Sequence, residues 1–324
     1  MESRELPFAL AHEQAAFRLL ELPDELLALL TSEHPPTLQI KSKGTHNDQA
    51  SSSTNSFAVL CTDSKTYQIR QVQTSNSLHI VQQSPVPGQD GLKDGLCSIA
   101  TCPATLELSA NSSDVGLDLK EMLVRWDGDE STKTTRGQSR EFIFANLPAS
   151  NGEITDKWSQ FCAFEVGDRS YTPTASAILN AWKAIHMAAE AEGQDLAVVA
   201  SNPAFFEKLA EEEGLPAAFL EAIRCRMIYQ NGGLTQTTTS WLAEVVLGSS
   251  PGTSLSRTVF LASWHDLLPE KWKTLATLDL IKPFTNQSDP TTIAWRESGS
   301  AFSIAPSKAA SSNRKWHERF KKGR

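Results

Sequence analysis

Apolar and polar positions alternate most clearly in residues 57–81. An apolar run at 57–61 precedes a turn at 63–65, and apolar and polar residues then alternate from Tyr67 with the period of a half-buried strand. A polar break at 74–76 separates a third apolar stretch. The pattern predicts a three-stranded meander, which is too small to bury both of its faces. It therefore needs more sheet, from elsewhere in the chain or from a partner.

Further strands are predicted on both sides of this meander. Phe17 and Leu19 start an entering strand, Pro23 followed by an acidic residue opens a short leucine-rich helix, and residues 38–41 alternate as another strand. Residues 96–108 return to strand chemistry, so the β-rich region closes near residue 110. The polar residues 44–56 and the Gly/Pro-rich residues 85–95 are predicted to be flexible loops.

The rest of the chain has the pattern of helices. Leu117, Leu119 and Trp126 fall on one helical face, and a further helix is predicted around Trp158. A small hairpin at 164–171 then precedes a long helix, for which Thr172 is the predicted N-cap and Pro173 the first residue. Further helices are predicted at 205–209, 219–228 and 241–247. Helices followed by a hairpin are typical of a winged helix.

The last block repeats this layout. A helix at 259–264, a turn at Leu268, a second helix at 270–278 and a wing in which Ile281 pairs with residues 292–295 match the helix-turn-helix family. The exposed face of that second helix carries Lys271 and Lys273. The nearby tryptophans are interpreted as core anchors rather than base-stacking platforms, since buried tryptophans dominate the cores of small domains. They are Trp264, Trp272 and Trp295.

The predicted fold is therefore α+β, with an N-terminal β-barrel-like region that partner subunits complete and tandem winged-helix domains after it. Residues 1–110 form the β-rich partner-binding domain and residues 111–190 the first winged helix. Residues 191–255 form a second, winged-helix-like helical block. Residues 256–324 form a third winged helix with a basic C-terminal tail. A length of 324 residues with 40% hydrophobic residues suits two or three ordinary soluble domains.

Composition and motifs exclude several classes of function. Five cysteines without a CxxC pair indicate buried thiols in a reducing compartment, with neither disulfides nor a metal site. No stretch approaches 18 apolar residues and the N-terminus lacks a signal pattern, which predicts an intracellular protein that does not span a membrane. GxSxG, HExxH and phosphate-loop spacings are absent, and the seven histidines are scattered. We therefore expect no catalytic activity and no cofactor.

Charge is distributed unevenly along the chain. Residues 1–150 hold 12 Lys and Arg against 19 Asp and Glu, whereas residues 307–324 hold seven cations against Glu318 alone. A basic end next to a helix-turn-helix pattern is suited to sequence-independent contacts with DNA phosphates, although a solvated charged terminus has the same pattern. The candidate DNA-binding residues are Lys271, Lys273, Arg296, Arg314, Lys315, Arg319, Lys321 and Lys322.

Four segments in order resemble one protein family. They are LLEL at 19–22, LQIKS at 38–42, AVLCTDSKTYQIRQVQTSNSLHIV at 58–81 and the strand at 106–108. Together they resemble the Dcc family of sister chromatid cohesion proteins, closely over about residues 15–110 and by order of elements beyond that. Residues 316–320 also look like the terminal region of the family.

The resemblance implies a non-ATPase subunit of the cohesion-type alternative replication factor C clamp loader, which acts in the nucleus on the PCNA sliding clamp. In that family the N-terminal β region shares a barrel with a small subunit and with the large AAA+ subunit. The winged helices reach DNA and polymerase epsilon. The residues proposed to contact the partner subunits are Phe57, Val59, Tyr67, Ile69, Leu78 and Ile80. The alternative is a protein-only scaffold between clamp loader and polymerase that makes no DNA contact.

Overall fold

The computed structural model of the chain describes residues 6–42, 58–88, 91–111, 113–128, 137–228, 234–250, 254–287 and 289–296. The chain forms two compact units. The sheet unit consists of residues 1–122 together with 138–158, and the helical unit consists of residues 123–137 together with 159–324. Strands and helices are both abundant, which confirms the predicted α+β class. The loop predicted at 44–56 lies outside the described residues.

The sheet unit contains one curled, half-barrel sheet of six strands. Its strands are β1 (Phe8–Leu10), β2 (Leu19–Glu21), β3 (Gln39–Ser42), β4 (Ala58–Cys61), β5 (Thr66–Gly88) and β6 (Gly91–Ala110). They pair in the order β1-β6-β5-β4-β3, and β2 also pairs with β6. Within the described part of the chain no pairing joins β1 to β3, so the sheet stays open.

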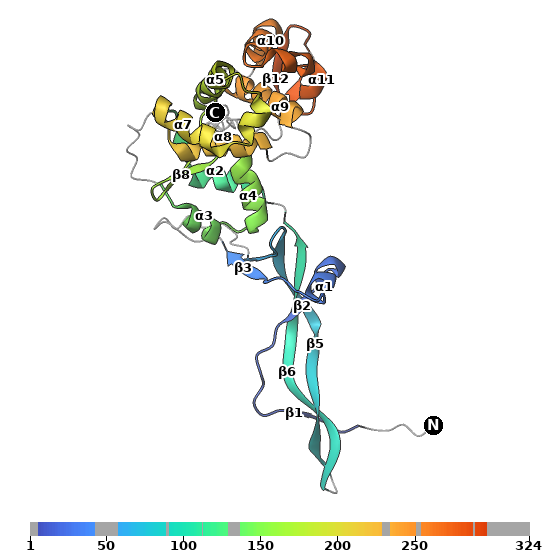
Figure 1. Ribbon diagram of the computed structural model, residues 1–324. Coiled ribbons are helices and arrows are strands. Elements are labelled where there is room, and N and C mark those ends of the chain that lie inside the picture. Colours follow the sequence, from blue (N-terminus) through green and yellow to red (C-terminus); the bar gives the residue numbers. More distant parts are fainter. Residues whose placement is uncertain are drawn as a thin grey trace, which may run out of the picture. The chain divides into compact units, whose positions relative to one another are not determined.

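The longest strands, β5 and β6, form one antiparallel hairpin (Figure 1). The break predicted at residues 74–76 is wrong, because β5 continues through it and the expected third strand is the outer half of β5. Residues 74–77 lie opposite Pro103, between the paired positions Gln73–Ala104 and Leu78–Cys102. Proline has no N–H to donate to the ladder, so the polar segment forms an irregularity in the strand instead of a turn.

The flexible loop predicted at 85–95 is also wrong in its described part. Pro85 pairs with Asp94 and Pro87 with Leu92, so both arms of this segment belong to the hairpin. Two prolines one residue apart direct their nitrogens toward the same edge of the strand. Among the residues that the structure describes, no strand pairs with this part of β5 on the side away from β6.

Helices α1 (Asp24–Leu30), α2 (Val115–Met122), α3 (Arg140–Asn146) and most of α4 (Asn151–Gln160) accompany the sheet. The helix predicted to open after Pro23 is confirmed, and its Leu26 packs with Leu60 and Tyr67. The helix predicted to extend to Trp126 ends at Met122 instead. Trp126 lies on β7 (Val124–Trp126), a strand that pairs with β9 (Arg169–Pro173).

The helical unit is built around one extensive apolar core. Its helices are α5 (Ala175–Ala191), α6 (Leu196–Ala200), α7 (Pro203–Glu213), α8 (Ala217–Ile228), α9 (Leu234–Gly248), α10 (Arg257–Asp266), α11 (Leu278–Ile281) and the 3₁₀ helix η1 (Glu270–Leu275). Two small sheets complete this unit. The first has the order β7-β9-β8, in which β8 is Phe164–Val166. The second contains β10 (Ser254–Ser256), β11 (Thr285–Asn286) and β12 (Thr292–Trp295) in the order β10-β12-β11. The hairpin predicted at 164–171 is confirmed as β8 and β9.

The long helix α5 begins later than its sequence predicts. Its N-cap is Thr174, whose hydroxyl accepts a hydrogen bond of 3.2 Å from the backbone N–H of Ala177. Thr172 and Pro173, the predicted cap and first residue, instead end strand β9 by pairing with β7. The sheet therefore takes the two residues whose local chemistry favours a helix start.

The last block differs from the predicted helix-turn-helix in two respects. Residues 270–275 form the 3₁₀ helix η1, and a separate short helix, α11, contains Ile281, which was expected to pair in the wing. The wing strand β12 pairs with β10 and β11 instead. The tryptophans are core residues as predicted: Trp264 and Trp272 are buried, and Trp295 packs against the same core.

Candidate partner-binding surface

The residues proposed to contact partners occupy different environments. Val59 and Tyr67 are buried within the sheet unit, and Ile69 packs against the same small cluster as Tyr67. Leu78 is exposed on β5, and Ile80 is partly buried. Phe57, the sixth candidate, lies outside the described residues. The inner half of the hairpin therefore uses its apolar side chains to pack the unit itself, and the outer half leaves more of them exposed.

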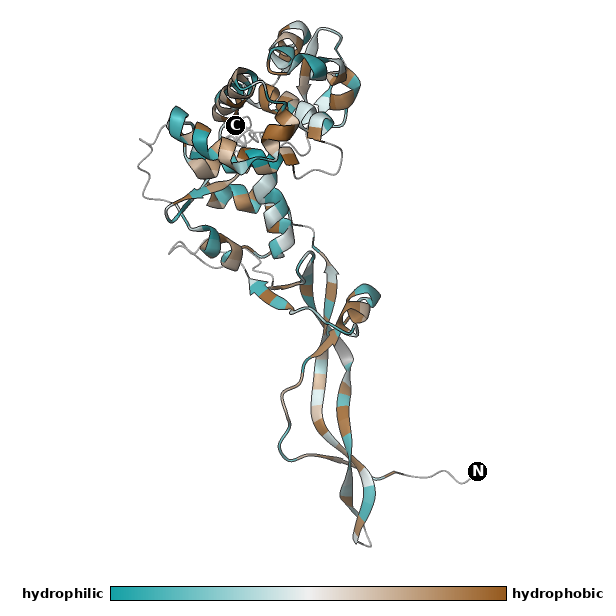
Figure 2. Cartoon of the chain, viewed as in Figure 1, coloured by the Kyte–Doolittle hydropathy of each residue, from teal (hydrophilic) through white to brown (hydrophobic). Residues whose placement is uncertain are grey.

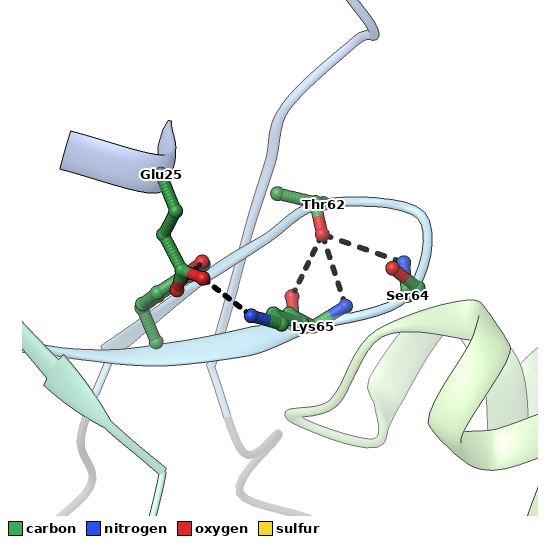
Figure 3. Close-up of polar contacts among 5 residues, drawn as sticks. Glu25, Thr62, Ser64 and Lys65 are labelled. Atoms are coloured by element: carbon green, nitrogen blue, oxygen red, sulfur yellow. Dashed lines mark hydrogen bonds and ion pairs between the residues drawn. The ribbon is translucent and has the colours of Figure 1, made fainter. Parts of the chain in front are cut away.

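Polar contacts fix the corner between β4 and β5 (Figure 3). The Thr62 hydroxyl accepts a hydrogen bond of 2.9 Å from the backbone N–H of Lys65, which closes the turn. The carboxylate of Glu25, on α1, accepts bonds from the Lys65 ammonium at 2.5 Å and from the Tyr67 hydroxyl at 2.6 Å. These contacts hold α1 against the sheet at the start of the hairpin.

The ionisation of this corner follows from the same contacts. The bonds from Lys65 and then Tyr67 lower the pKa of the Glu25 carboxyl. Burial, followed by the bond to Glu25, raises the pKa of Tyr67 to about 12. Glu25 therefore stays a carboxylate and Tyr67 a neutral donor at neutral pH, which is the pairing that the geometry requires.

A buried lysine joins β3 to the segment between α3 and α4. The Lys41 ammonium donates to the carbonyls of Phe144 and Ala149 and to Oδ1 of Asn151, each at 2.9 Å. Three acceptors match the three N–H bonds of an ammonium, so the buried charge is satisfied. Burial still lowers the pKa of Lys41, because a charged group loses hydration there.

The N-terminus of α4 is held against β5 in the same region. Ser150 and Glu153 form a capping box, in which the Glu153 N–H donates to Ser150 Oγ at 3.2 Å and the Ser150 N–H donates to Glu153 Oε2 at 3.3 Å. Ser150 Oγ also donates to Glu153 Oε2 at 2.7 Å. The Thr66 hydroxyl donates to the same carboxylate and accepts the Ser150 N–H at 2.7 Å. Gly152 is required here, because a Cβ would lie 2.7 Å from the carbonyl oxygen of Asp63.

One face of the hairpin carries exposed apolar side chains, which we call the arm surface. It consists of Phe8, Leu10, Val81 and Leu92, whose side chains are 53%, 62%, 42% and 73% exposed. The register places them on one face, because Phe8 pairs with Leu96, and Leu10 and Val81 both lie opposite Ser98. Figure 2 shows apolar and polar residues alternating along β5 and β6. Strands β1, β5 and β6 thus present these apolar side chains on one face, on which the polar residues Gln83 and Asp94 also lie.

The free edge of β3 is a second feature of this unit. β3 pairs with β4 on one side, and among the described residues no strand pairs with its other side. Ile40 is exposed there, beside a hollow of about 510 Å³ lined by Gln39, Lys41, Phe144, Ala145 and Asn151. Unpaired backbone groups at a sheet edge can accept a strand from another chain.

The predicted DNA-contacting cations are dispersed or balanced by acids. Lys271 lies on η1 with its ammonium 3.7 Å from Asp195, and Lys273 donates to Glu270 at 2.7 Å. The bond to Glu270 raises the pKa of Lys273. Arg296 follows β12 and lies against the Pro283 carbonyl at 3.5 Å. The remaining candidates, Arg314, Lys315, Arg319, Lys321 and Lys322, lie outside the described residues.

Carboxylates accompany other cations of the helical unit as well. Lys208 bonds to Glu192 at 2.8 Å, and Arg224 bonds to Glu221 at 2.7 Å. A DNA phosphate at such a cation would have to displace a carboxylate that is already in place. Within the described residues, no group of three or more His, Cys, Asp and Glu could hold a metal ion. No helix of the described chain is long and apolar enough to cross a membrane.

Sequence reasoning missed all four residues of the arm surface as partner candidates. Phe8 and Leu10 lie on a strand of three residues, too short for alternation to reveal, and their pairing with β6 is a long-range contact. Leu92 lay inside a predicted loop. Val81 was recognised as part of a strand, but only pairing with Ser98 places it beside Leu10.

A comparison with known families supplies the identity of the chain. The family model described as sister chromatid cohesion protein Dcc1 matches residues 17–299, which is most of the chain. The match includes β2 to β12 and thus nearly all of both units. It agrees with the family that the segments at 19–22, 38–42, 58–81 and 106–108 resemble. The chain therefore belongs to the Dcc1 family of sister chromatid cohesion proteins.

Proposed function

We propose that this chain is a non-catalytic subunit of the cohesion-type alternative replication factor C complex, which loads or unloads the PCNA clamp at replication forks in the nucleus. Membership of the Dcc1 family gives a role in sister chromatid cohesion and supports this assignment. In the proposal, the sheet unit joins the large AAA+ subunit and the small subunit. The winged helices at 111–190 and 256–324, together with the winged-helix-like block at 191–255, bind polymerase epsilon and DNA.

The arm surface is the observation that carries the proposal. A two-stranded ribbon is marginal by itself in water, and here its apolar face is exposed although β1 reinforces one side. Covering a half-exposed apolar side chain contributes about 1 kcal/mol. Four such residues on one face, next to an open sheet, suit a surface that another protein covers.

Copurification of the full-length chain with the two clamp-loader subunits tests this assignment. We expect the double variant Phe8→Asp/Leu10→Asp to weaken their binding by at least about tenfold, since two charges replace apolar side chains that the complex would bury. Met187→Asp is the matched control, because Met187 is exposed on α5 of the helical unit. Undiminished binding by the double variant, or equal loss in the control, contradicts the assignment.

Direct DNA contact is the second part of the proposal, and the basic end of the chain supports it. Roughly five phosphate contacts give a log-log slope of binding against salt of about −4 to −5. Replacing Arg314, Lys315, Arg319, Lys321 and Lys322 by Ala should flatten the slope. An unchanged slope in that variant rules out the tail as the contact.

A protein-only scaffold is the second candidate function. The pairing of Lys271 with Asp195 and of Lys273 with Glu270 favours it, because the exposed cations of η1 are already balanced by carboxylates. A gel shift at low salt separates the two functions. No shift by the full-length chain, together with retained binding to polymerase epsilon, supports the scaffold.

A further inference from the structure

A mainly apolar hollow on the surface of the helical unit has no part in the functions above. It lies between α5, the end of α9, β10 and α10, and its volume is about 290 Å³. Figure 1 shows α5, α9 and α10 close together in this unit. The buried residues that line the hollow are Val246, Phe260 and Leu267, and the partly buried Leu179 and Leu255 pack against the same core. We call it the α10 hollow.

The apolar lining of the α10 hollow continues to the protein surface. Val259 is 57% exposed, although the next residue on α10, Phe260, is fully buried. Two exposed residues of opposite charge, Lys183 and Asp266, and three serines form the rest of the lining. Exposed apolar surface with a polar margin is typical of a site that another segment or another protein covers.

A second hollow of the same unit has the opposite kind of lining. It has a volume of about 310 Å³ and lies between the end of α5, α6 and η1. Charged side chains line much of it, and two of them, Lys271 and Asp195, lie 3.7 Å apart. An apolar segment placed there would remove charged groups from water, which is unfavourable. The α10 hollow therefore suits an apolar segment better than this second hollow does.

The described part of the chain ends beside the α10 hollow. Ile293 on β12 pairs with Leu255 on β10, and Ala294 pairs with Ser254. Because the two strands are antiparallel, β12 runs toward the end of β10 that follows Ser250, and both Leu255 and Ser250 line the hollow. The last described residue comes two positions after Ala294. Residues 297–324 therefore start next to the hollow.

The first apolar stretch after this point is at residues 301–305. Its sequence is Ala-Phe-Ser-Ile-Ala, and the polar residues 297–300 precede it. Phe302 and Ile304 are two positions apart, so an extended backbone places both side chains on one face. Phe302 comes eight residues after Ala294, and eight extended residues span up to about 26 Å. Since β12 lies directly beside Leu255, this length is sufficient to reach the lining of the hollow.

We propose that residues 301–305 bind in the α10 hollow of the same chain, with the ring of Phe302 against Val259 and Phe260. Binding removes the Phe302 ring and the exposed Val259 side chain from water, which is the driving force. A segment tethered by so few residues has an effective concentration of about millimolar, so it has an advantage over a free segment of similar sequence. This contact goes beyond the functions proposed above and requires neither DNA nor a clamp-loader subunit.

Digestion of the native full-length chain by chymotrypsin, which cuts after aromatic residues, tests the proposal. Phe302 belongs to the proposed segment, whereas Phe320 lies near the end of the same tail. Each rate is divided by the rate at the same bond in a synthetic peptide of residues 297–324, which corrects for local sequence. We expect cleavage after Phe302 to be at least about tenfold slower than after Phe320, because the protease acts on the released segment. Equal corrected rates overturn the proposal.

A variant of the hollow tests where the protection comes from. Val259→Asp should raise cleavage after Phe302 to the rate in the peptide. This change is compatible with folding, because Val259 is exposed and an acidic residue is favourable in the first turn of α10. Met187→Asp is the matched control, since Met187 is exposed on α5 but does not line the hollow. Retained protection in Val259→Asp, or equal loss in the control, overturns the proposal.

Photo-crosslinking identifies the occupant of the hollow directly. A benzophenone side chain placed at position 302 of the full-length chain should attach to lining residues of α5, α9 or α10, and mass spectrometry should find the product within one chain. Attachment to other parts of the chain, attachment to a second copy, or no attachment overturns the proposal.

Discussion

The two units of the chain handle their apolar residues in opposite ways. In the helical unit, one core includes buried residues from Trp126 to Ile293, and its largest side chains are fully enclosed. In the sheet unit, the cluster around Leu26, Leu60 and Tyr67 is small, and further buried apolar residues such as Leu119, Ile143 and Ile154 lie on α2, α3 and α4. Of the large hydrophobic residues found exposed among those described, twelve lie in the sheet unit and six in the helical unit. The helical unit therefore encloses most of its apolar side chains, whereas the sheet unit leaves apolar surface that another molecule could cover.

Geometry accounts for this difference. Helices pack side chains against several neighbours at once, so a bundle of them encloses its apolar stripes. A hairpin as long as β5 and β6 has two faces and only short strands beside it. Its inner end is covered by α1 and braced by Lys41 and the N-terminus of α4, and its outer end is not. The same chain thus contains a self-sufficient part and a part whose surface favours association.

The largest expected effect comes from the core of the helical unit. Trp264→Ala should lower the free energy of unfolding by about 3–5 kcal/mol, since a fully buried ring is replaced by a cavity and the Thr239 carbonyl loses its donor. The measurement is chemical denaturation followed by circular dichroism. Phe8→Ala on the arm surface is the comparison and should cost less than about 1 kcal/mol. Equal losses for the two variants would remove the contrast between the units.

The brace at Lys41 ranks second. Lys41→Met should lower the free energy of unfolding by roughly 2–3 kcal/mol, because the carbonyls of Phe144 and Ala149 lose their shared donor in a buried site. Gln39→Met is the control, since Gln39 is exposed on the same strand. Proteolysis of β3 and α3 in the native state should accelerate in the first variant alone. If both variants behave alike, the lysine does not join these elements.

A smaller effect, confined to alkaline pH, is expected at the corner of the hairpin. The pKa of Tyr67 is raised to about 12, above its value in an unfolded chain. Its contribution to stability is therefore complete below about pH 10 and decreases as the pH rises toward 12. Tyr67→Phe should make the free energy of unfolding less dependent on pH in this range. Absorbance of tyrosinate should show that the variant lacks a titration near pH 12.

The smallest effect is expected on η1. Lys271→Ala and Lys273→Ala should leave the unfolding midpoint unchanged within error, because exposed ion pairs gain little in water. Both variants also test DNA binding by the full-length chain. Unchanged affinity at low salt indicates that η1 makes no phosphate contact, whereas a loss in either variant restores it as a candidate DNA-binding element.

Local sequence chemistry was sufficient for elements whose pattern and environment agree. The turn before Lys65, the helix that opens after Pro23 and the hairpin at β8 and β9 each depend on residues close together in the chain. The burial of Trp264 and Trp272 in the last block was also predictable, because large apolar side chains usually lie in a core. The errors occurred where a distant strand outcompeted local preference, as β6 did at residues 74–76 and β7 did at Thr172.

The sequence by itself determined that a β-rich region comes first, that helical blocks with small hairpins follow, and which family the chain resembles. These depend on periodicity and on short motifs, which are local. Only the tertiary structure decided that β5 and β6 form one hairpin, that Phe8 and Leu92 share its exposed face, and that Lys41 of β3 is buried against α3 and the segment after it. Those features depend on register and on contacts across about a hundred residues, which no local pattern encodes.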